Sequence, residues 1–452
     1  MRFKGTSILL LVFLILGSYV YFAEYRGRDE RQKQEEAKKK AFQVEEKDIT
    51  DITLKYPDRT IEGVKKGEKQ WEFVNPAGIE TDPDEWQMLA SNITRIERED
   101  TVAQNAQDLT PFGLNQPQVT VAAKLTNGKT IEISFGAENP RKTYHYAKLA
   151  GNNDVFLAPN NWATTFTRTV SDLRNKNVLN FETEDIDSVK IAAASTELDM
   201  QKSGEHWQIK KPIDTAAEDT EVTSLVNSMK FARASSFPNG IDAKKVGLEP
   251  PAIRISLHDK KANADRVLLI GTTSETDKYY ARDASRDVIF IIDKEIPDKA
   301  RRPVFDWRDK SITRVDRNAI EQIDILRGTE KVSINKVDAD WKLSDGKKVQ
   351  WDKVSTLLTT MEFDKAKDVI DQPNGLSTYG LDKPRLEAVF HKGSSEIGRL
   401  TFGAESKSPE GVYMKTSENA VVKVVGKDVF DKFNFKAEDV IETPPPAAPA
   451  KK

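Results

Sequence analysis

The chain has 452 residues, of which 38% are hydrophobic and 31% charged, and its formal net charge is only −3. A chain of this length can hold about three domains of roughly 100–150 residues each. The near balance of 69 basic and 72 acidic residues leaves no cationic excess for a phosphate backbone, so no nucleic-acid partner is expected. The absence of cysteine excludes disulfides, thiolate nucleophiles and cysteine-ligated metal sites.

Residues 1–23 begin the chain with 19 consecutive uncharged residues, which lie between Lys4 and Glu24. This length suits a helix that crosses a hydrocarbon core of about 30 Å, and Tyr19 and Tyr21 lie where an interfacial aromatic belt is found. We therefore expect an uncleaved transmembrane anchor, with the bilayer as a partner. A cleaved signal peptide is the alternative, which the long apolar run and the bulky Tyr21 disfavour.

Residues 24–43 are expected to form a charged stalk, because Glu35 and Glu36 each have a lysine four residues later. A basic patch that contacts phospholipid is the alternative. Seven basic residues follow the apolar run and two precede it, so the positive-inside rule by itself would keep the body in the cytoplasm. A short basic N-terminus before one span is nevertheless typical of a signal anchor. We therefore predict a single-pass protein of the inner (cell) membrane with a periplasmic or otherwise extracytoplasmic body.

The rest of the chain repeats itself three times. A Gly-Leu-x-x-Pro element occurs as "FGLNQP", "VGLEPP" and "YGLDKP", and its glycines Gly113, Gly247 and Gly380 are separated by 134 and 133 residues. The segments "WEFVNP", "WQIKKP" and "WKLSDG" recur with a similar period. Solenoid repeats run at about 20–50 residues, so this period indicates duplicated domains, each with its own core. The predicted modules are residues 44–182, 183–313 and 314–437, followed by a disordered Pro/Ala tail at 438–452.

Within each copy, alternating β-branched and aromatic residues predominate, as in "ITDITL", "QVTVAAKL" and "TIEISF". The Asn127-Gly128 pair predicts a type I′ hairpin turn, in which both central residues have positive φ. A helix follows each tryptophan strand, and Asp82 with Pro83 predicts the N-cap and first turn of one of them. The predicted fold class is α+β, with three tandem repeats of a mainly antiparallel β-meander module. Each module carries one or two helices, and the three stand behind an N-terminal transmembrane helix.

The repeated elements are expected to provide shape. In Gly-Leu-x-x-Pro, the glycine can take a positive φ, the leucine can fill the core and the proline can begin a strand. A phosphate-binding loop is the alternative, but the element has one glycine and no adjacent Lys-Ser or Lys-Thr pair. Trp71, Trp207 and Trp341 are predicted to occupy equivalent core positions.

A second element, "DLRNK" and then "DWRDK", stands at the two junctions between copies and has no counterpart after the third copy, which reads "FNFKAED". We expect Leu173 and Trp307 to pack at these junctions. We expect Arg174 and Arg308 to bond to carbonyls or acids of the neighbouring copy. A basic pair that binds a partner is the alternative.

The sequence indicates no catalytic, cofactor-binding or metal-binding residue, and therefore no cofactor and no enzymatic activity. It has no nucleophile elbow, phosphate-binding loop or dinucleotide fingerprint. No two of the abundant acids are singled out as a catalytic pair. The histidines are isolated and lack metal-ligand spacing; they are His145, His206, His258 and His391.

Several of these motifs together resemble the bacterial family called domain of unknown function 4340, from the N-terminus to about residue 437. They are the start "LVFLILGSYVYFAEYRG", the Gly-Leu-x-x-Pro element, "FGAE", the strand pair "YAK" and "VF", and "LRNK" with "VLNF". Members of that family are typically membrane-anchored and often encoded beside ABC-type transport components similar to those linked with gliding motility. The resemblance carries over no catalytic residue.

This resemblance implies a non-catalytic, membrane-anchored extracytoplasmic scaffold or accessory protein, with ABC-type permease or ATPase subunits as partners. The alternative is an extracytoplasmic hydrolase or glycan-binding protein that uses an acid-lined cleft between modules.

Overall fold

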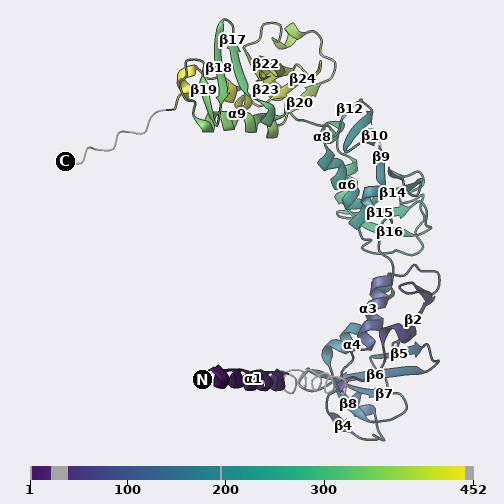
Figure 1. Ribbon diagram of the computed structural model, residues 1–452. Coiled ribbons are helices and arrows are strands. Elements are labelled where there is room, and N and C mark those ends of the chain that lie inside the picture. Colours follow the sequence, from purple (N-terminus) through teal and green to yellow (C-terminus); the bar gives the residue numbers. More distant parts are fainter. Residues whose placement is uncertain (1–2, 22–38, 194–195, 443–452) are drawn as a thin grey trace. The chain divides into compact units, whose positions relative to one another are not determined.

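The computed structural model describes residues 3–21, 39–193 and 196–442 (Figure 1). Its strands form three separate eight-stranded sheets whose strand pairs are antiparallel. The predicted α+β class with three tandem repeats is confirmed. The chain divides into two compact units. The first comprises Met1–Asn177 and Arg233–Phe237. The second comprises Val178–Ala232 and Pro238–Lys452 and so contains the sheets of the second and third modules.

Among the described residues, the helix α1 (Phe3–Val20) lies before the first module. Its uninterrupted apolar stretch, residues 8–16, has nine residues, whereas about 20 are needed to span a bilayer. Among the described residues, none of the helices is long and apolar enough to cross a membrane. The predicted anchor at residues 1–23 and the predicted inner-membrane location with an extracytoplasmic body are therefore wrong. Most of the predicted stalk, and residues 443–452 of the predicted tail, lie outside the described residues.

The first module consists of two meanders joined through β1 and β5, with the sheet order β3-β2-β1-β5-β6-β7-β8-β4. Its strands are β1 (Ile49–Lys55), β2 (Thr60–Lys65), β3 (Trp71–Asn75), β4 (Thr101–Ala103), β5 (Val119–Leu125), β6 (Thr130–Glu138), β7 (Tyr144–Leu149) and β8 (Val155–Pro159). Its helices are α3 (Pro83–Ile93), α4 (Asn160–Phe166) and α5 (Val170–Leu173). Helix α3 occupies the crossover between the two meanders.

The second module shares the central seven strands of this plan, but it carries the short β12 beside β11 in place of an edge strand like β4, so its order is β12-β11-β10-β9-β13-β14-β15-β16. Its strands are β9 (Ile186–Ala193), β10 (Thr196–Ser203), β11 (His206–Lys211), β12 (Thr215–Ala216), β13 (Ile253–Asp259), β14 (Ala264–Glu275), β15 (Lys278–Asp283) and β16 (Ile289–Asp293). Its helices are α6 (Asp219–Phe231), α7 (Glu295–Ala300) and α8 (Val304–Trp307).

The third module has the order β19-β18-β17-β21-β22-β23-β24-β20, which matches the first. Its strands are β17 (Gln322–Arg327), β18 (Glu330–Val337), β19 (Asp340–Leu343), β20 (Asp368–Ile370), β21 (Leu386–Lys392), β22 (Ser395–Lys407), β23 (Glu410–Thr416) and β24 (Val422–Val425). Its α-helices are α9 (Trp351–Phe363) and α10 (Lys427–Phe433). Short 3-10 helices in the chain are η2 (Glu46–Asp48), η3 (Thr110–Phe112), η4 (Thr183–Asp185), η5 (Arg317–Ala319), η6 (Leu376–Tyr379) and η7 (Ala437–Val440).

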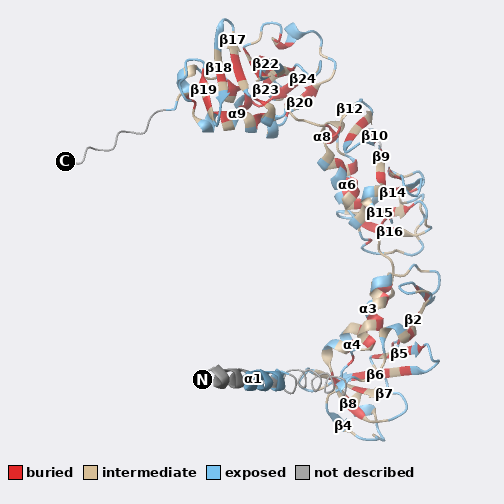
Figure 2. Ribbon diagram, viewed as in Figure 1, coloured by how far each residue is buried: buried red, intermediate tan, exposed pale blue. Residues whose placement is uncertain are grey.

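The modules bury separate cores beneath their sheets. Figure 2 shows the buried residues gathered on the strands of each module. The hydrophobic clusters of the first and third modules share no residue. Trp71, Trp207 and Trp341 are each 5% exposed, which confirms their predicted equivalence as core residues.

Helix α3 begins as predicted. The Asp82 carboxylate accepts hydrogen bonds from the backbone N–H groups of Asp84 and Glu85, and Pro83 occupies the first helical turn. Since these N–H groups have no partner within the helix, the cap stabilises its start.

The Gly-Leu-x-x-Pro element provides shape, as predicted. Its three glycines have φ between 64° and 67°, a backbone conformation that favours glycine, and its three leucines are buried. A glycine in the second strand after this element (β6, β14 or β22) packs directly against this turn. A Cβ there would lie 2.0–2.2 Å from a carbonyl oxygen of the turn, which is far inside van der Waals contact. The pairs are Gly136 with Phe112, Gly271 with Val246 and Gly403 with Tyr379.

The hairpin between β5 and β6 turns at Asn127-Gly128, as predicted, but its turn type differs. Gly128 has φ +81°, whereas Asn127 is not among the residues with positive φ. The N–H of Gly128 donates to the carbonyl of Leu125, and the N–H of Leu125 donates to the carbonyl of Lys129. This arrangement is a type I turn closed by a glycine bulge, because only one residue takes the left-handed conformation.

Candidate functional site

The junction between the second and third modules concentrates buried polar groups. The N–H of Glu218 donates to the carbonyl of Trp307 (2.8 Å), and the N–H of Asp309 donates to the carbonyl of Ala216 (2.9 Å). On the other side, the N–H of Ala366 donates to the carbonyl of Lys310 (2.7 Å). The connecting chain is therefore hydrogen-bonded to both modules.

Arg308 fixes this connection with a bidentate ion pair. Its side chain is 7% exposed, and its two Nη atoms donate to the two carboxylate oxygens of Asp371 at 2.9 and 2.8 Å. Asp371 directly follows β20 of the third module, and Trp307 is fully buried. The expected role of Arg308 and Trp307 at the junction is confirmed. In the first unit, the Arg174 guanidinium lies over the ring of Phe237, 3.4 Å from its centroid.

The third copy does have a counterpart of this junction element, contrary to the sequence prediction. Ile441 forms a β-bridge with Val349, as Arg308 does with Ala217. The preceding Val440 is fully buried and takes the place of Trp307. The third module therefore continues beyond residue 437. An apolar residue stands where the other copies have arginine, so residue identity alone did not reveal the repeat.

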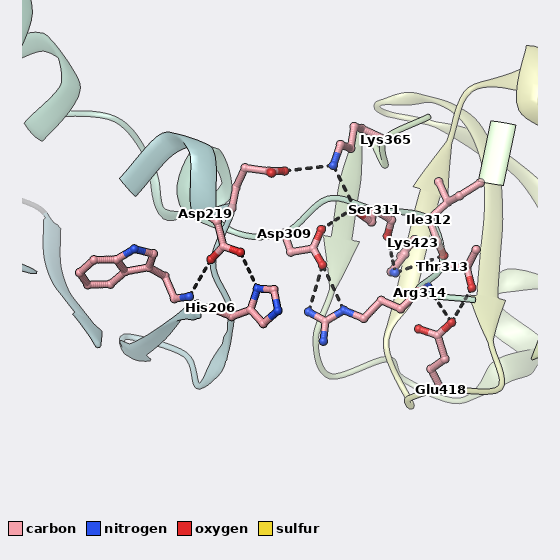
Figure 3. A network of polar contacts seen from close by, with 12 residues as sticks. His206, Asp219, Asp309, Ser311, Ile312, Thr313, Arg314, Lys365, Glu418 and Lys423 are labelled. Atoms are coloured by element: carbon pink, nitrogen blue, oxygen red, sulfur yellow. Dashed lines mark hydrogen bonds and ion pairs between the residues drawn. The ribbon is translucent and has the colours of Figure 1, made fainter. Parts of the chain in front are cut away.

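A cavity of about 510 Å³ opens at the junction. Residues from both modules line it, and most of them are polar or charged. They are Gln208, Asp214, Thr215, Ala216, Arg308, Asp309, Ser311, Arg314, Val315, Val369, Ile397, Glu418, Asn419, Val421 and Lys423. Figure 3 shows several of these side chains joined in one network of polar contacts.

The carboxylates of this network, Asp309 and Glu418, already accept hydrogen bonds from neighbouring groups. Asp309 accepts from the N–H of Ser311 (2.8 Å) and from Nη2 of Arg314 (3.0 Å). Burial alone would raise the pKa of Asp309, but the hydrogen bonds from Ser311 and Arg314 outweigh it and hold the pKa below its ordinary value. Glu418 accepts from the N–H of Arg314 (2.9 Å) and from the Thr313 hydroxyl.

Lys423 is a second buried cation of the cavity, besides Arg308. The residue is 7% exposed, and its Nζ donates to the carbonyl oxygens of Ser311 (2.7 Å) and Ile312 (3.3 Å). Burial lowers the pKa of Lys423, although the nearby Glu418 and Asp309 oppose the shift. The ammonium group therefore ties β24 to the connecting chain.

A further ion pair crosses the same junction. Nζ of Lys365 lies 3.1 Å from the Glu218 carboxylate and also 3.1 Å from the Ser311 hydroxyl (Figure 3). Beside it, His206 Nδ1 lies 2.7 Å from the Asp219 carboxylate. The charged groups of the two modules compensate one another locally.

A general acid requires a carboxyl group with a raised pKa, whereas the pKa of the half-buried Asp309 is held below its ordinary value. Over residues 3–21, 39–193 and 196–442, no group of three His, Asp or Glu side chains is placed to hold a metal ion. The four histidines contact local partners, namely His145 with the Gly136 carbonyl, His206 with Asp219, His258 with Asp265 and His391 with Asp324.

Sequence reasoning identified Arg308 but missed Glu418 and Lys423. One signal was available, because Lys423 interrupts the valine run "VVKVV" of a buried strand. A lysine in such a run requires buried acceptors. The acceptors come from the connecting chain more than 100 residues earlier, which no local pattern indicates.

Comparisons with known proteins agree with the repeat. The family model described as "Domain of unknown function (DUF4340)" matches three times, at residues 71–241, 207–362 and 341–445, and each match begins at a repeated tryptophan. A search of curated proteins gave no match.

Two solved structures are similar to the chain only in a loose sense. The DNA polymerase sliding clamp of Pseudomonas aeruginosa with ligand is 7% identical, covers 87% of this chain and 95% of its own, and has a TM-score of 0.16. The DnaN sliding clamp of the same organism bound to griselimycin is 8% identical, covers 85% and 92%, and has a TM-score of 0.12. Similarity this low supports no conclusion about this chain.

Proposed function

This chain belongs to the family described as Domain of unknown function (DUF4340), and from that premise we propose that it is a non-catalytic scaffold or accessory protein whose modules bind other proteins. ABC-type permease or ATPase subunits are the proposed partners, as the family resemblance implies. Three copies of one module offer three surfaces to which a partner protein can bind. Once one module is bound, a fixed spacing raises the effective concentration of the partner at the next module.

The junction between the second and third modules carries this proposal. Arg308 and Asp371 form a bidentate pair, and Glu218 pairs with Lys365 across the same junction. The backbone of the connecting chain is hydrogen-bonded to both modules. A junction fixed in this way holds two binding surfaces at a constant spacing, which a scaffold requires.

Crosslinking followed by affinity purification of the full-length protein tests the proposal. We expect permease or ATPase subunits to be recovered, and we expect Asp371→Ala to reduce their recovery because it loosens the junction. A Lys353→Gln variant, changed on an exposed face of α9, should recover as much as the wild type. Recovery of no transport subunit, together with measurable hydrolysis of glycan or peptide by the purified protein, would overturn the scaffold proposal.

A second candidate function is the binding of a glycan in the junction cavity. Its volume of about 510 Å³ lies within the range of small-molecule sites, and Gln208, Asp214, Thr215 and Asn419 place hydrogen-bonding groups along its walls. Titration with soluble oligosaccharides, with Thr215→Val as the variant expected to weaken binding, separates this candidate from the scaffold.

A further inference from the structure

A groove of about 370 Å³ on the third module lies away from the junction cavity. One wall comes from α9, with Trp351, Ser355 and Leu358. The opposite side comes from the β18–β19 hairpin and η5, with Trp341 as the floor and Lys336 and Arg317 at the rim. Apolar and cationic side chains therefore face the same space.

Trp351 is the unusual residue of this groove. It is 61% exposed, whereas the other six tryptophans of the chain are buried or half-buried. Trp351, Ser355 and Leu358 follow one another at spacings of four and three, so they form one stripe along α9. Glu362 continues the stripe and pairs with Arg317, which closes the far end of the groove.

The first module shows the same place filled. The buried residues of α3 and α9 align Trp86 with Val354, so Gln87 corresponds to Ser355. The Gln87 side chain accepts from Nε1 of Trp71 (3.5 Å) and donates to Glu46. Serine has three fewer side-chain heavy atoms than glutamine, so it cannot span the same distance. The space beside the core tryptophan is consequently open in the third module.

The second module shows what Trp351 replaces. The residue at the corresponding first position of α6 is Asp219, which accepts from the N–H of Trp207 (2.6 Å) and contacts His206 (2.7 Å). These contacts tie the start of the helix to β11. A tryptophan cannot accept them, and in the third module it presents an exposed indole instead. The third module therefore lacks both the Gln87 contact of the first module and the Asp219 contact of the second. The corresponding residues, Ser355 and Trp351, lie one turn apart on α9.

We propose that this groove binds an extended peptide segment of a partner protein, with an apolar side chain beside Trp341 and Trp351 and a carboxylate beside Lys336. The proposal rests on the scaffold function above and specifies the chemistry of the partner. The groove lining includes no Asp or Glu. Arg317 is already paired with Glu362, whereas Lys336 has no ion pair among the described residues, so its ammonium group is the part of the rim that is complementary to an acid. Exposed aromatic side chains are typical anchors of protein interfaces.

The dimensions agree with a short peptide. The stripe from Trp351 to Glu362 is about 16 Å long at about 1.5 Å per helical residue, which equals about five residues of extended chain. The chain's own segment 443–452, "TPPPAAPAKK", carries two lysines and no acidic side chain, so its charge does not fit the rim. A second polypeptide is therefore the proposed occupant.

Fluorescence anisotropy with the full-length protein and three labelled peptides tests the proposal. The peptides are "EEPLPLEE", its charge-reversed form "KKPLPLKK", and "TPPPAAPAKK". We expect only the acidic peptide to bind. Trp351→Ala should weaken its binding at least about tenfold, as truncation of an aromatic anchor does. Lys336→Ala should reduce the preference for the acidic over the basic peptide.

The matched variants are Ser355→Gln and Thr356→Gln, which add the same side chain on two faces of α9. Ser355→Gln refills the groove as Gln87 does in the first module, so it should abolish peptide binding and keep the unfolding midpoint. Thr356 is exposed and lies off the stripe, so its variant should bind normally. Equal binding of the acidic and basic peptides, preference for "TPPPAAPAKK", failure of the acidic peptide to bind, or unchanged binding by Ser355→Gln would overturn the proposal.

The same variant separates this proposal from the scaffold function. If Ser355→Gln abolishes peptide binding and also reduces recovery of the transport subunits, both proposals are supported. If it leaves that recovery unchanged, the scaffold stands and the groove is not its partner site. If the wild type recovers no subunit but binds the acidic peptide through Trp351, the scaffold proposal fails and the groove remains a peptide site.

Discussion

Removing the carboxylate of Asp371 should loosen the junction more than removing the charge of Arg308. The two charges differ in how well water can replace the lost partner. The Arg308 side chain is 7% exposed, whereas the Asp371 side chain is 25% exposed. Asp371→Ala therefore strands a buried guanidinium, while Arg308→Met leaves a carboxylate that water can reach.

Breaking a buried ion pair by removing one partner costs about 3–5 kcal/mol. We place Asp371→Ala near the lower end, at about 3 kcal/mol, because Asp371 is partly exposed. Arg308→Met keeps most of the side-chain volume and should cost about 1–2 kcal/mol, since the remaining carboxylate is rehydrated. Replacing both residues with apolar ones, Arg308→Met with Asp371→Leu, should recover most of the loss, because no unpaired charge remains.

Native-state hydrogen exchange measures this directly. The amides of Asp309 and Ala366 bond the connecting chain to the second and the third module respectively. In Asp371→Ala we expect the Ala366 amide to exchange about a hundredfold faster, which corresponds to about 3 kcal/mol. Equal exchange in both single variants, or faster exchange in Arg308→Met than in Asp371→Ala, would refute the reasoning from burial.

Three further predictions concern the modules themselves. Trp207→Ala should destabilise the second module by about 3–5 kcal/mol in urea unfolding, and an unchanged midpoint would contradict its place in the core. Gly271→Ala should lower the free energy of unfolding by at least about 1–3 kcal/mol, since its Cβ would lie 2.0 Å from the Val246 carbonyl oxygen. In the control Gly67→Ala, the added Cβ faces only a flexible glutamine, so the same assay should show almost no change. Burial lowers the pKa of Lys423 below its ordinary 10.5, so the unfolded chain binds more protons between those two values. The free energy of unfolding should therefore rise as pH increases towards 10.5, and Lys423→Met should remove that rise; a rise of the same size in the variant would exclude Lys423 as its cause.

Patterns that repeat every 134 residues or so were enough to predict three modules, their strand-rich composition and the equivalence of the three core tryptophans. Local chemistry also identified the Asp82 cap and the turn at Gly128. The predictions that failed were of two kinds. The prediction of a membrane span was based on the absence of charged residues, but Gly, Ser and Thr interrupt the apolar residues of this segment. The junction element of the third copy was missed because Ile441 replaces an arginine while keeping the same backbone bridge.

The sequence by itself determined the modules. Alternation of apolar side chains and the need for glycine at a tight turn are local properties, and each of the three copies contains both patterns. Only the tertiary structure decided the candidate sites. The acceptors of Lys423 lie more than 100 residues before it, and the groove beside Trp351 depends on what the corresponding residues of other copies reach in space. Such contacts join residues that are far apart in the sequence and meet only when the chain packs. The residues next to a side chain in the sequence therefore do not indicate whether it has a partner in the folded protein.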